Sequence, residues 1–495
     1  MAQLIIVSNR VAVPNGKDAP QAGGLATVVK AALKLHPGLW FGWTGRVADP
    51  AHLETRKSVH RGITYVVTDL ADEDYQEYYN GFANRVLWPI LHYRLDLAEF
   101  SRRDLSGYLR VNELFARKLD KIVRPDDWIW IHDYHLIPLA QFLRACGHKN
   151  RIGFFAHTPF PPPEIMTALP NHERLIPTLR HYDLVGFQTG GDAFNFTRYL
   201  TRECGMHSLD FNFPVEDRVM RVDAFPVSIA TAQFAKLARR AEKSSFVRQV
   251  LASLIGRAMI IGVDRLDYSK GIIQRMEAFE RFLAANQAMR NRVSYLQITP
   301  KSRIDIREYA EMNRQVGELV GRINGTYGEA NWTPIRYVNR PYSRTALAGL
   351  FRAARAALVT PFYDGMNLVA KEFVAAQNPD DPGVLILSRF AGAAHELERA
   401  LLVNPFDPDA VSGAIARALH MPLSERKERY QAMFEVISRN DVSNWARRYI
   451  DALQDLTSVT HWAERHFPLP RGNSANDRAP LADDGPGAIC EFARA

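Results

Sequence analysis

The chain has 495 residues and a formal net charge of +8, from 62 lysines and arginines against 54 aspartates and glutamates. That length is too great for one ordinary hydrophobic core, so we expect two domains. Hydrophobic residues make up 47% and charged residues 23%, a balance typical of globular proteins. No apolar run is long enough to cross a bilayer, and we therefore expect no membrane partner.

The N-terminus and the cysteines indicate the compartment. The first residues, MAQLIIVSNR, lack the basic flank of a secretory signal and predict a buried strand instead. Cys146, Cys204 and Cys490 show no CxxC spacing, which favours free thiols in a reducing cytoplasm. Basic residues are spread through mixed-charge helical segments and form no stripe, so we expect no nucleic-acid partner.

Short β-rich runs alternate with amphipathic helical segments along the whole chain. Most of these runs are continuously apolar, as expected for parallel strands that are covered on both faces. The alternation predicts an α/β protein with doubly wound sheets. In chain order, the predicted strands cover residues 4–8, 64–69, 128–132, 152–158, 184–189, 258–264, 294–299, 335–339, 356–361, 383–388 and 401–405.

The chain is expected to change domain within VDAFPVSI (222–229), where Pro226 stops any helix from continuing. We expect two similar α/β domains that face each other across a cleft. A C-terminal helix should cross back to the first domain, and a tail rich in Pro, Gly, Ala and Asp should be disordered. The corresponding bounds are 1–225, 226–440, 441–467 for the helix and 468–495 for the tail.

Ligands of open α/β sheets bind at the carboxyl ends of the strands, and polar groups concentrate there in this sequence. Arg10 follows the first strand, and Gly23 and Gly24 precede the next helix. Amides at such a helix start can cradle a phosphate, and Arg10 could clamp the same anion. Ordinary turn chemistry would also explain the glycine pair.

Two further strand ends carry an acid and an imidazole. Asp133 follows strand 128–132, where a carboxylate suits a sugar hydroxyl or a proton-accepting role, although it could equally cap the next helix. His157 ends the run 152–158 and is followed by a stiff proline-rich loop that would hold it in place. A lone histidine can also be purely structural.

Cations gather after two strands of the second half. Arg265 and Lys270 lie five residues apart on a loop before a helix, where they could hold a diphosphate and stabilise it as a leaving group. The alternative is a solvated loop in which Asp264 pairs with Arg265. Arg303 lies at another cationic strand end.

The segment TPFYDGMNLVAKE (360–372) reads as strand, glycine loop and helix, with the helix beginning near Asn367. Its first amides could meet a phosphate or a sugar ring. Glu372 lies one turn after Leu368 on the same face, where a carboxylate can bind both hydroxyls of a ribose. The alternative is an exposed Lys–Glu helix surface.

Several motifs are missing. The sequence has no GxxxxGK[ST] loop, no HExxH and no GxGxxG after a strand, which argues against an NAD-linked oxidoreductase. Asp72-Glu73-Asp74 is similar to a metal-binding DxD motif, but it lies in an acidic turn that we interpret as a solvated helix start. We predict neither a metal nor a cofactor.

Together these segments resemble the trehalose-6-phosphate synthases, which are retaining glycosyltransferases of the GT-B fold with two Rossmann-like domains. The similarity follows the family's order over roughly residues 1–465. The segments are SNR with AGGL, LWFGW (39–43), EYYNGFANRVLWP (77–89), WIHDYHL (130–136), IGFFAHTPFP (152–161), VDRLDYSKG (263–271) and TPFYDGMNLVAKEFVAAQ (360–377).

The resemblance implies an enzyme that transfers glucose from a nucleotide diphosphate-glucose to glucose 6-phosphate with retention, giving α,α-trehalose 6-phosphate. It implies a glucose 6-phosphate domain followed by a donor domain, and a homodimer or homotetramer. UDP-glucose is the default donor, with ADP and GDP left open. A relative that couples cyclitols on the same fold and a silent regulatory homologue remain alternatives, although the intact cations argue against the second.

The family's roles transfer to this chain residue by residue. The acceptor would be held by Arg10, Tyr79, Trp88, Asp133 and Arg303. The donor would be held by Gly23, Gly24, His157, Arg265, Lys270, Tyr342 at the base, Asp364, Met366, Asn367, Leu368, Val369, Ala370, Lys371 and Glu372. The catalytic set would be Arg265, Lys270, His157 and Asp133.

The implied mechanism is a front-face displacement through an oxocarbenium-like ion pair. No carboxylate is placed as a covalent nucleophile, and the resemblance implies that the leaving phosphate itself accepts the acceptor's proton. Arg265 and Lys270 would stabilise the departing diphosphate in place of a metal.

Overall fold

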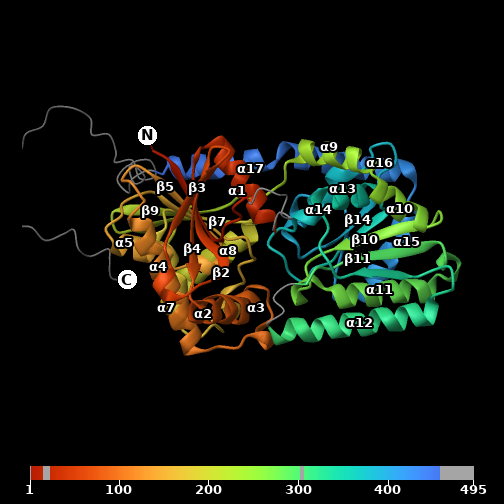
Figure 1. Ribbon diagram of the computed structural model, residues 1–495, viewed down its shortest axis with the longest axis horizontal. Coiled ribbons are helices and arrows are strands. Elements are labelled where there is room, and N and C mark those ends of the chain that lie inside the picture. The colour runs from red at the N-terminus through yellow and green to blue at the C-terminus, as the bar shows by residue number, and fades with distance from the viewer. Residues whose placement is uncertain (1, 15–22, 302–305, 457–495) are drawn as a thin grey trace, which may run out of the picture.

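The computed structural model describes residues 2–14, 23–301 and 306–456. Two open α/β sheets lie side by side along the long axis of the molecule (Figure 1). Arg303, Cys490, residues 457–467 of the predicted C-terminal helix and the predicted tail lie outside the described residues.

The first sheet has the strand order β3-β4-β2-β1-β5-β6-β7-β9-β8. Its interior pairs are parallel, and the edge pairs β3–β4 and β8–β9 are antiparallel. The central strands are continuous apolar runs because helices cover both faces of the sheet. The strands are β1 (Leu4–Arg10), β2 (Gly38–Val47), β3 (Arg56–His60), β4 (Ile63–Leu70), β5 (Trp128–His132), β6 (Ile152–Phe155), β7 (Leu184–Phe187), β8 (Asn212–Val215) and β9 (Arg218–Ala224).

The second sheet is parallel throughout, in the order β12-β11-β10-β13-β14-β15. This order places β10 and β13 at its centre, where their carboxyl ends can share a ligand. The strands are β10 (Ala258–Val263), β11 (Val293–Ile298), β12 (Ile335–Val338), β13 (Ala356–Val359), β14 (Val384–Ser388) and β15 (Leu401–Val403).

Helices connect the strands, as doubly wound sheets require. The longer ones are α1 (Gly23–Leu35), α4 (Arg102–Asp120), α5 (Leu139–Ala145), α8 (Gly190–Cys204), α9 (Thr231–Ala241), α10 (Ser245–Ser253), α11 (Ile272–Ala285), α12 (Arg307–Tyr327), α13 (Arg344–Ala353), α14 (Leu368–Ala376), α15 (Pro408–His420), α16 (Leu423–Arg439) and α17 (Val442–Gln454). Shorter ones are α2 (Asp72–Asp74), α3 (Trp88–Leu91), α6 (Pro163–Met166) and α7 (His172–Leu175), and a π-helix spans Tyr75–Leu87.

Each predicted strand has a counterpart, but the sequence analysis missed β2, β3, β8 and β9. All five residues of β3 are exposed, and β8 and β9 form a hairpin at the opposite edge, so neither place shows a continuous apolar run. The predicted strand 152–158 ends early, at Phe155, which leaves His157 in the loop that follows.

Helix α17 packs on the first sheet, although it follows the last strand of the second (Figure 1). The Tyr449 ring stacks on Trp130 at 4.2 Å between centroids, and its hydroxyl donates to the Phe154 carbonyl at 2.9 Å. Gly153 makes room for it, because a Cβ there would lie 2.5 Å from the Tyr449 hydroxyl oxygen. The helix therefore completes the first domain's core.

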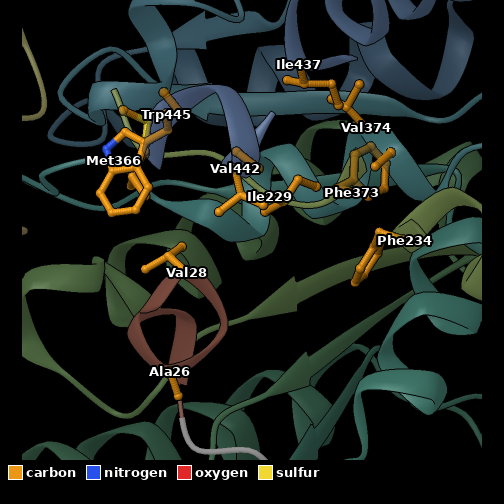
Figure 2. Packing of buried hydrophobic residues seen from close by; sticks show 14 of the residues in the cluster. Ala26, Val28, Ile229, Phe234, Met366, Phe373, Val374, Ile437, Val442 and Trp445 are labelled. Carbon is orange, nitrogen blue, oxygen red and sulfur yellow. The ribbon is translucent and has the colours of Figure 1, made fainter. Parts of the chain in front are cut away.

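One hydrophobic cluster continues through both domains and the chain segments that join them. Figure 2 shows Ile229 beside Val442, with Phe373, Val374 and Ile437 along the same layer. The chain crosses between the sheets at residues 225–230 and again at residues 440–441. Phe225, Val227 and Ile229 at the first crossing and Val442 directly after the second belong to this cluster. The domains are thus joined by packed core as well as by chain.

We expect Tyr449→Ala to lower the free energy of unfolding by about 3–5 kcal/mol, since it removes a fully buried ring. Tyr449→Phe should lower it by only about 0.5–1.5 kcal/mol, the worth of one hydrogen bond. Urea unfolding followed by tryptophan fluorescence measures both. Equal losses would show that the hydroxyl matters more than the ring.

Candidate functional site

The candidate site lies where strand ends of the two sheets meet. Gly365, after β13, lies against His157, after β6, so closely that a Cβ on Gly365 would be 2.1 Å from the His157 carbonyl oxygen. Likewise, a Cβ on Gly24 at the start of α1 would lie 2.8 Å from Leu368 Cδ1 at the start of α14. Sequence-predicted residues from both halves therefore come together here.

A continuous row of side chains leads across the first domain's part of the site. The Arg10 guanidinium lies 5.5 Å from the centre of the Trp43 ring, and that ring is 5.5 Å from Tyr79. Tyr79 stacks on His135 at 5.9 Å. This row of packed rings ends at the exposed Arg10.

Trp88 extends this row of rings to the second domain. It lies 5.6 Å from Tyr134 on its own side, and its Nε1 donates to Asp267 Oδ1 at 3.4 Å on the other side. The exposed Arg265 guanidinium lies 5.8 Å from the centre of the Trp88 ring. Predicted acceptor and donor residues are therefore in contact through Trp88.

Asp133 follows β5 in a strained conformation, with φ of 78° in a residue that is not glycine. Its Oδ1 accepts from the His157 amide at 3.2 Å and makes no cap bond to the short 3₁₀-helix Tyr134–Leu136. The helix-cap interpretation is therefore wrong. Strain of this kind is typical of functional positions. The hydrogen bond between Asp133 and the His157 amide joins the ends of β5 and β6.

His157 is supported from behind by His132, a residue that the sequence analysis did not single out. His132 Nδ1 lies 3.0 Å from His157 Nε2, so one ring donates to the other. Burial lowers the pKa of His157 to about 3 and that of His132 well below its usual value, so both rings are neutral near pH 7. With Nε2 in that bond, Nδ1 is the ring nitrogen of His157 that could take part in a further hydrogen bond.

Lys270 and Asp364 form an ion pair at the centre of the second domain's part of the site. Lys270 Nζ donates to Asp364 Oδ2 at 2.5 Å, and Asn367 Nδ2 donates to the same oxygen at 3.1 Å. Both charged side chains are largely buried, at 11% and 15% exposed. Lys270, which the sequence predicts to hold a diphosphate, therefore pairs with a carboxylate in this structure.

Beneath this pair, Arg275 of α11 fixes the surrounding backbone. It is fully buried, pairs with Asp264 at 2.7 Å, and donates to Thr360 Oγ1 at 2.9 Å and to the Lys270 carbonyl at 3.0 Å. The alternative pairing of Asp264 with Arg265 is therefore wrong. Arg265 is left to lie over Trp88.

The helix start predicted near Asn367 is found there. Asn367, with φ of 74°, caps α14 by accepting from the Ala370 amide at 3.2 Å. Met366 and Ala370 are buried, whereas Leu368 and Val369 are partly exposed. Polar contacts of these apolar residues with a ligand would have to come from their backbone.

The neighbours Lys371 and Glu372 point to different surroundings. Glu372 is partly exposed, 3.6 Å from Arg344, and burial raises its pKa to about 7. Lys371 is fully buried and donates to the Val227 carbonyl at 2.8 Å. The exposed Lys–Glu surface is therefore not what the structure shows, and the Lys371 ammonium faces away from the site.

Tyr342, the predicted base contact, lies on the loop before α13. Its ring centre is 5.3 Å from that of Phe246, and the Arg340 guanidinium lies 5.3 Å over the same ring. The ring is partly exposed and so could still stack on a planar ligand.

Two residues of the acidic triplet Asp72–Asp74, Glu73 and Asp74, form ion pairs. The triplet opens the helical segment before the π-helix, and Asp74 pairs with Arg110 at 2.7 Å. Within the part of the chain that the structure describes, no three His, Cys, Asp or Glu side chains gather as a metal's ligands would. No helix there is both long and apolar enough to span a bilayer.

The sequence analysis did not single out two further residues of the site. Asp267 accepts from Trp88 and from the Ser269 amide at 3.0 Å, and its spacing to Ser269 is that of an Asx turn, which the sequence could have revealed. His92 is buried beside Trp88, 4.0 Å between ring centres. Burial, and then nearby Lys270, lower its pKa to about 4. Nothing in the sequence marks it.

Comparisons with known proteins agree over nearly the whole chain. The model of glycosyltransferase family 20 matches residues 3–455. A trehalose-6-phosphate synthase of Sinorhizobium fredii is 52% identical over 461 residues, which are 92% of this chain and 99% of that protein. One of Cronobacter sakazakii is 45% identical over 92% of this chain and 96% of its own length.

Solved structures show the same architecture. An α,α-trehalose-phosphate synthase (UDP-forming) of Burkholderia xenovorans, in complex with glucose-6-phosphate, is 47% identical, with a TM-score of 0.89 over 92% of this chain and all of that one. An E. coli counterpart bound with UDP-2-fluoro glucose is 43% identical, with a TM-score of 0.86 and the same coverage. The predicted GT-B architecture is confirmed.

Proposed function

Because the chain belongs to glycosyltransferase family 20 and is an enzyme of the trehalose-6-phosphate synthase type, we propose that it transfers glucose from UDP-glucose to glucose 6-phosphate. The product would be α,α-trehalose 6-phosphate, formed with retention. The relatives from Burkholderia xenovorans and E. coli support the two substrates, since one binds glucose-6-phosphate and the other a UDP-glucose analogue.

The observation that carries this proposal is the approach of two helix starts, one from each domain, next to a loop that carries two cations. Arg265 and Lys270 come from the loop after β10, and the starts of α1 and α14 approach each other where Gly24 faces the Leu368 side chain. Backbone N–H groups at helix starts and side-chain cations both favour phosphate oxygens. A nucleotide diphosphate is a ligand of matching chemistry.

The acceptor would lie against the row of rings in the first domain that ends at Arg10. Its phosphate would meet Arg10 and Tyr79, together with Arg303, whose role stays a prediction. Trp88 would face the sugar, and the Asp133 carboxylate, whose Oδ1 also accepts from the His157 amide, would accept from a sugar hydroxyl.

The donor would change the partners of Lys270. A bound diphosphate competes for the ammonium that Asp364 now holds, which frees the Asp364 carboxylate for hydroxyls of the donor sugar. Neutral His157 would contact the same sugar, Tyr342 the base and Glu372 the ribose. Lys270 and Arg265 would then stabilise charge on the departing diphosphate, while its phosphate accepts the acceptor's proton.

Three further expectations belong to the same proposal. We propose that the reaction needs no metal, because cations and helix starts supply the positive charge. We propose a cytoplasmic location, since Cys146 and Cys204 are free thiols, and a homodimer or homotetramer in solution. The domain bounds 1–225 and 226–440 are also kept as proposed, with α17 added to the first domain.

One assay tests the function. The protein is mixed with glucose 6-phosphate and UDP-, ADP- or GDP-glucose in turn, with a chelator present, and nucleotide diphosphate release is followed. Proton NMR of the product reads the configuration at both anomeric carbons. Cyclitol coupling or silence as a regulator would give no disaccharide with any donor, and a β-linkage would exclude retention.

We expect Lys270→Ala to lower kcat by about 10²–10³-fold and to change KM much less, because its charge matters most as the diphosphate leaves. Steady-state kinetics with both substrates varied measure this. Lys57→Ala, on the exposed edge strand β3, is the control and should leave both constants unchanged. Unaltered turnover in the Lys270 variant would contradict its catalytic role.

The donor's KM should depend on pH through Glu372. Burial raises the pKa of this carboxyl to about 7, whereas ribose hydroxyls need the ionised form as an acceptor. Protons therefore compete with the donor below pH 7, and KM should rise as pH falls, by up to about tenfold per pH unit once the carboxyl is mostly protonated.

Measured between pH 5.5 and 8.5, Glu372→Gln should show a raised donor KM with a flattened pH profile. The KM for glucose 6-phosphate should change with pH in the same way in the wild type and in the variant. A variant that keeps the wild-type pH slope would show that another group titrates.

A further inference from the structure

Lys371 carries a charge at a fully buried position of the second domain. Its side chain is fully buried, and its ammonium donates to the Val227 carbonyl at 2.8 Å and to Glu396 Oε2 at 2.5 Å. Burial lowers its pKa, with Glu396 opposing the shift. A buried ion pair is often no more stabilising than an apolar pair of the same volume, so its position calls for an explanation beyond stability.

The carbonyl that Lys371 binds belongs to the first crossing between the domains. Val227 lies in residues 225–230, which join β9 to α9. Its amide donates in turn to Gln188 Oε1 at 3.0 Å, directly after β7 of the first sheet. Lys371 is therefore two hydrogen bonds away from the carboxyl end of a strand in the other domain.

The carboxylate that Lys371 binds reaches the second crossing. Glu396 Oε1 accepts from Asn440 Nδ2 at 3.2 Å, at the point where α16 gives way to α17. The two crossings are joined to each other, because the Val442 amide donates to the Ile229 carbonyl at 3.0 Å. Figure 2 shows Ile229 and Val442 next to each other, near Phe373 and Val374 of α14.

Lys371 lies in the middle of α14, the helix that is expected to hold the donor. Asn367 caps its start, Leu368 in its first turn contacts Gly24 of the first domain, and Glu372 follows Lys371 directly. A helix of nine residues moves as one body. A contact that holds the middle of α14 against the crossings therefore also sets how the donor-binding groups of α14 face the first sheet.

We propose that Lys371 is a positioning residue, which with Glu396 fastens α14 to both interdomain crossings and so sets the geometry in which the two domains meet around the substrates. This rests on the proposed function, in that α14 holds the donor. Displacement by about 1 Å can lower a rate about 10²-fold, and an imprecisely closed site admits water. Lys371 thus serves transfer without contacting a substrate.

Two variants separate positioning from stability. Lys371→Met leaves Glu396 buried without its cation and should lower the melting temperature, whereas the Lys371→Met, Glu396→Met double variant should regain part of that loss because no unpaired charge remains. If Lys371 positions α14, both variants should lose about 10- to 100-fold in transfer kcat. Both should also release a larger share of free glucose from the donor.

Arg426→Met is the matched control. Arg426 is also a buried cation of the second domain, with Nη1 on the Pro382 carbonyl at 2.6 Å and on Asp381 at 2.5 Å, but it bonds neither crossing. It should cost stability and leave the ratio of free glucose to disaccharide unchanged. A double Lys371 variant with the wild-type ratio and kcat would overturn the proposal.

A distance measurement needs no turnover. Spin labels are attached through Lys57→Cys and Glu318→Cys, at exposed positions one on each domain, in a full-length chain whose native cysteines are replaced by serine. Pulsed electron resonance should show a broader interdomain distance distribution with Lys371→Met than with Arg426→Met. Equal widths in the two variants would overturn the proposal, even if the wild-type protein transfers glucose. If the wild-type protein shows no transfer but Lys371→Met broadens the distribution, the result would count only against the proposed function.

Discussion

The site depends on a backbone-to-backbone approach between the two domains. Gly365 lies against the His157 carbonyl, and a Cβ on Gly392 would lie 1.9 Å from the Gly365 carbonyl oxygen. Three loops therefore stack with no side chain between them, which is possible only because two of the facing positions are glycines. Any side chain there would separate Asp133 and His157 from Lys270 and Asp364.

Within that contact, the structure neutralises most of its own charge. Lys270 pairs with Asp364, buried Arg275 pairs with Asp264, and burial keeps His132 and His157 neutral. Arg10 and Arg265 differ, because they lie over the Trp43 and Trp88 rings at the exposed margins. An aromatic face orients a guanidinium without using up its N–H donors, and among the described residues these two arginines show no hydrogen bond to a carboxylate.

Much of this arrangement followed from the sequence, because continuous apolar runs with polar ends can be placed in few ways. The parallel strands and the chemistry after β1, β5, β6, β10 and β13 were predicted on that basis. Partner choice was not. Spacing alone could not show that Asp264 takes Arg275 of the next helix over adjacent Arg265, or that Lys371 turns inward beside Glu372. Such choices depend on which face of a helix packs against the sheet or the neighbouring segments.

The placement of α17 has a consequence for how the protein is made. Tyr449 and Trp445 cover Trp130 at the centre of the first sheet, yet they are translated after the whole second domain. A growing chain usually folds its N-terminal domain first. Here the ribosome must release residues near 450 before that aromatic surface is covered, so the nascent first domain stays unfinished throughout synthesis of the second and is open to chaperones until the end.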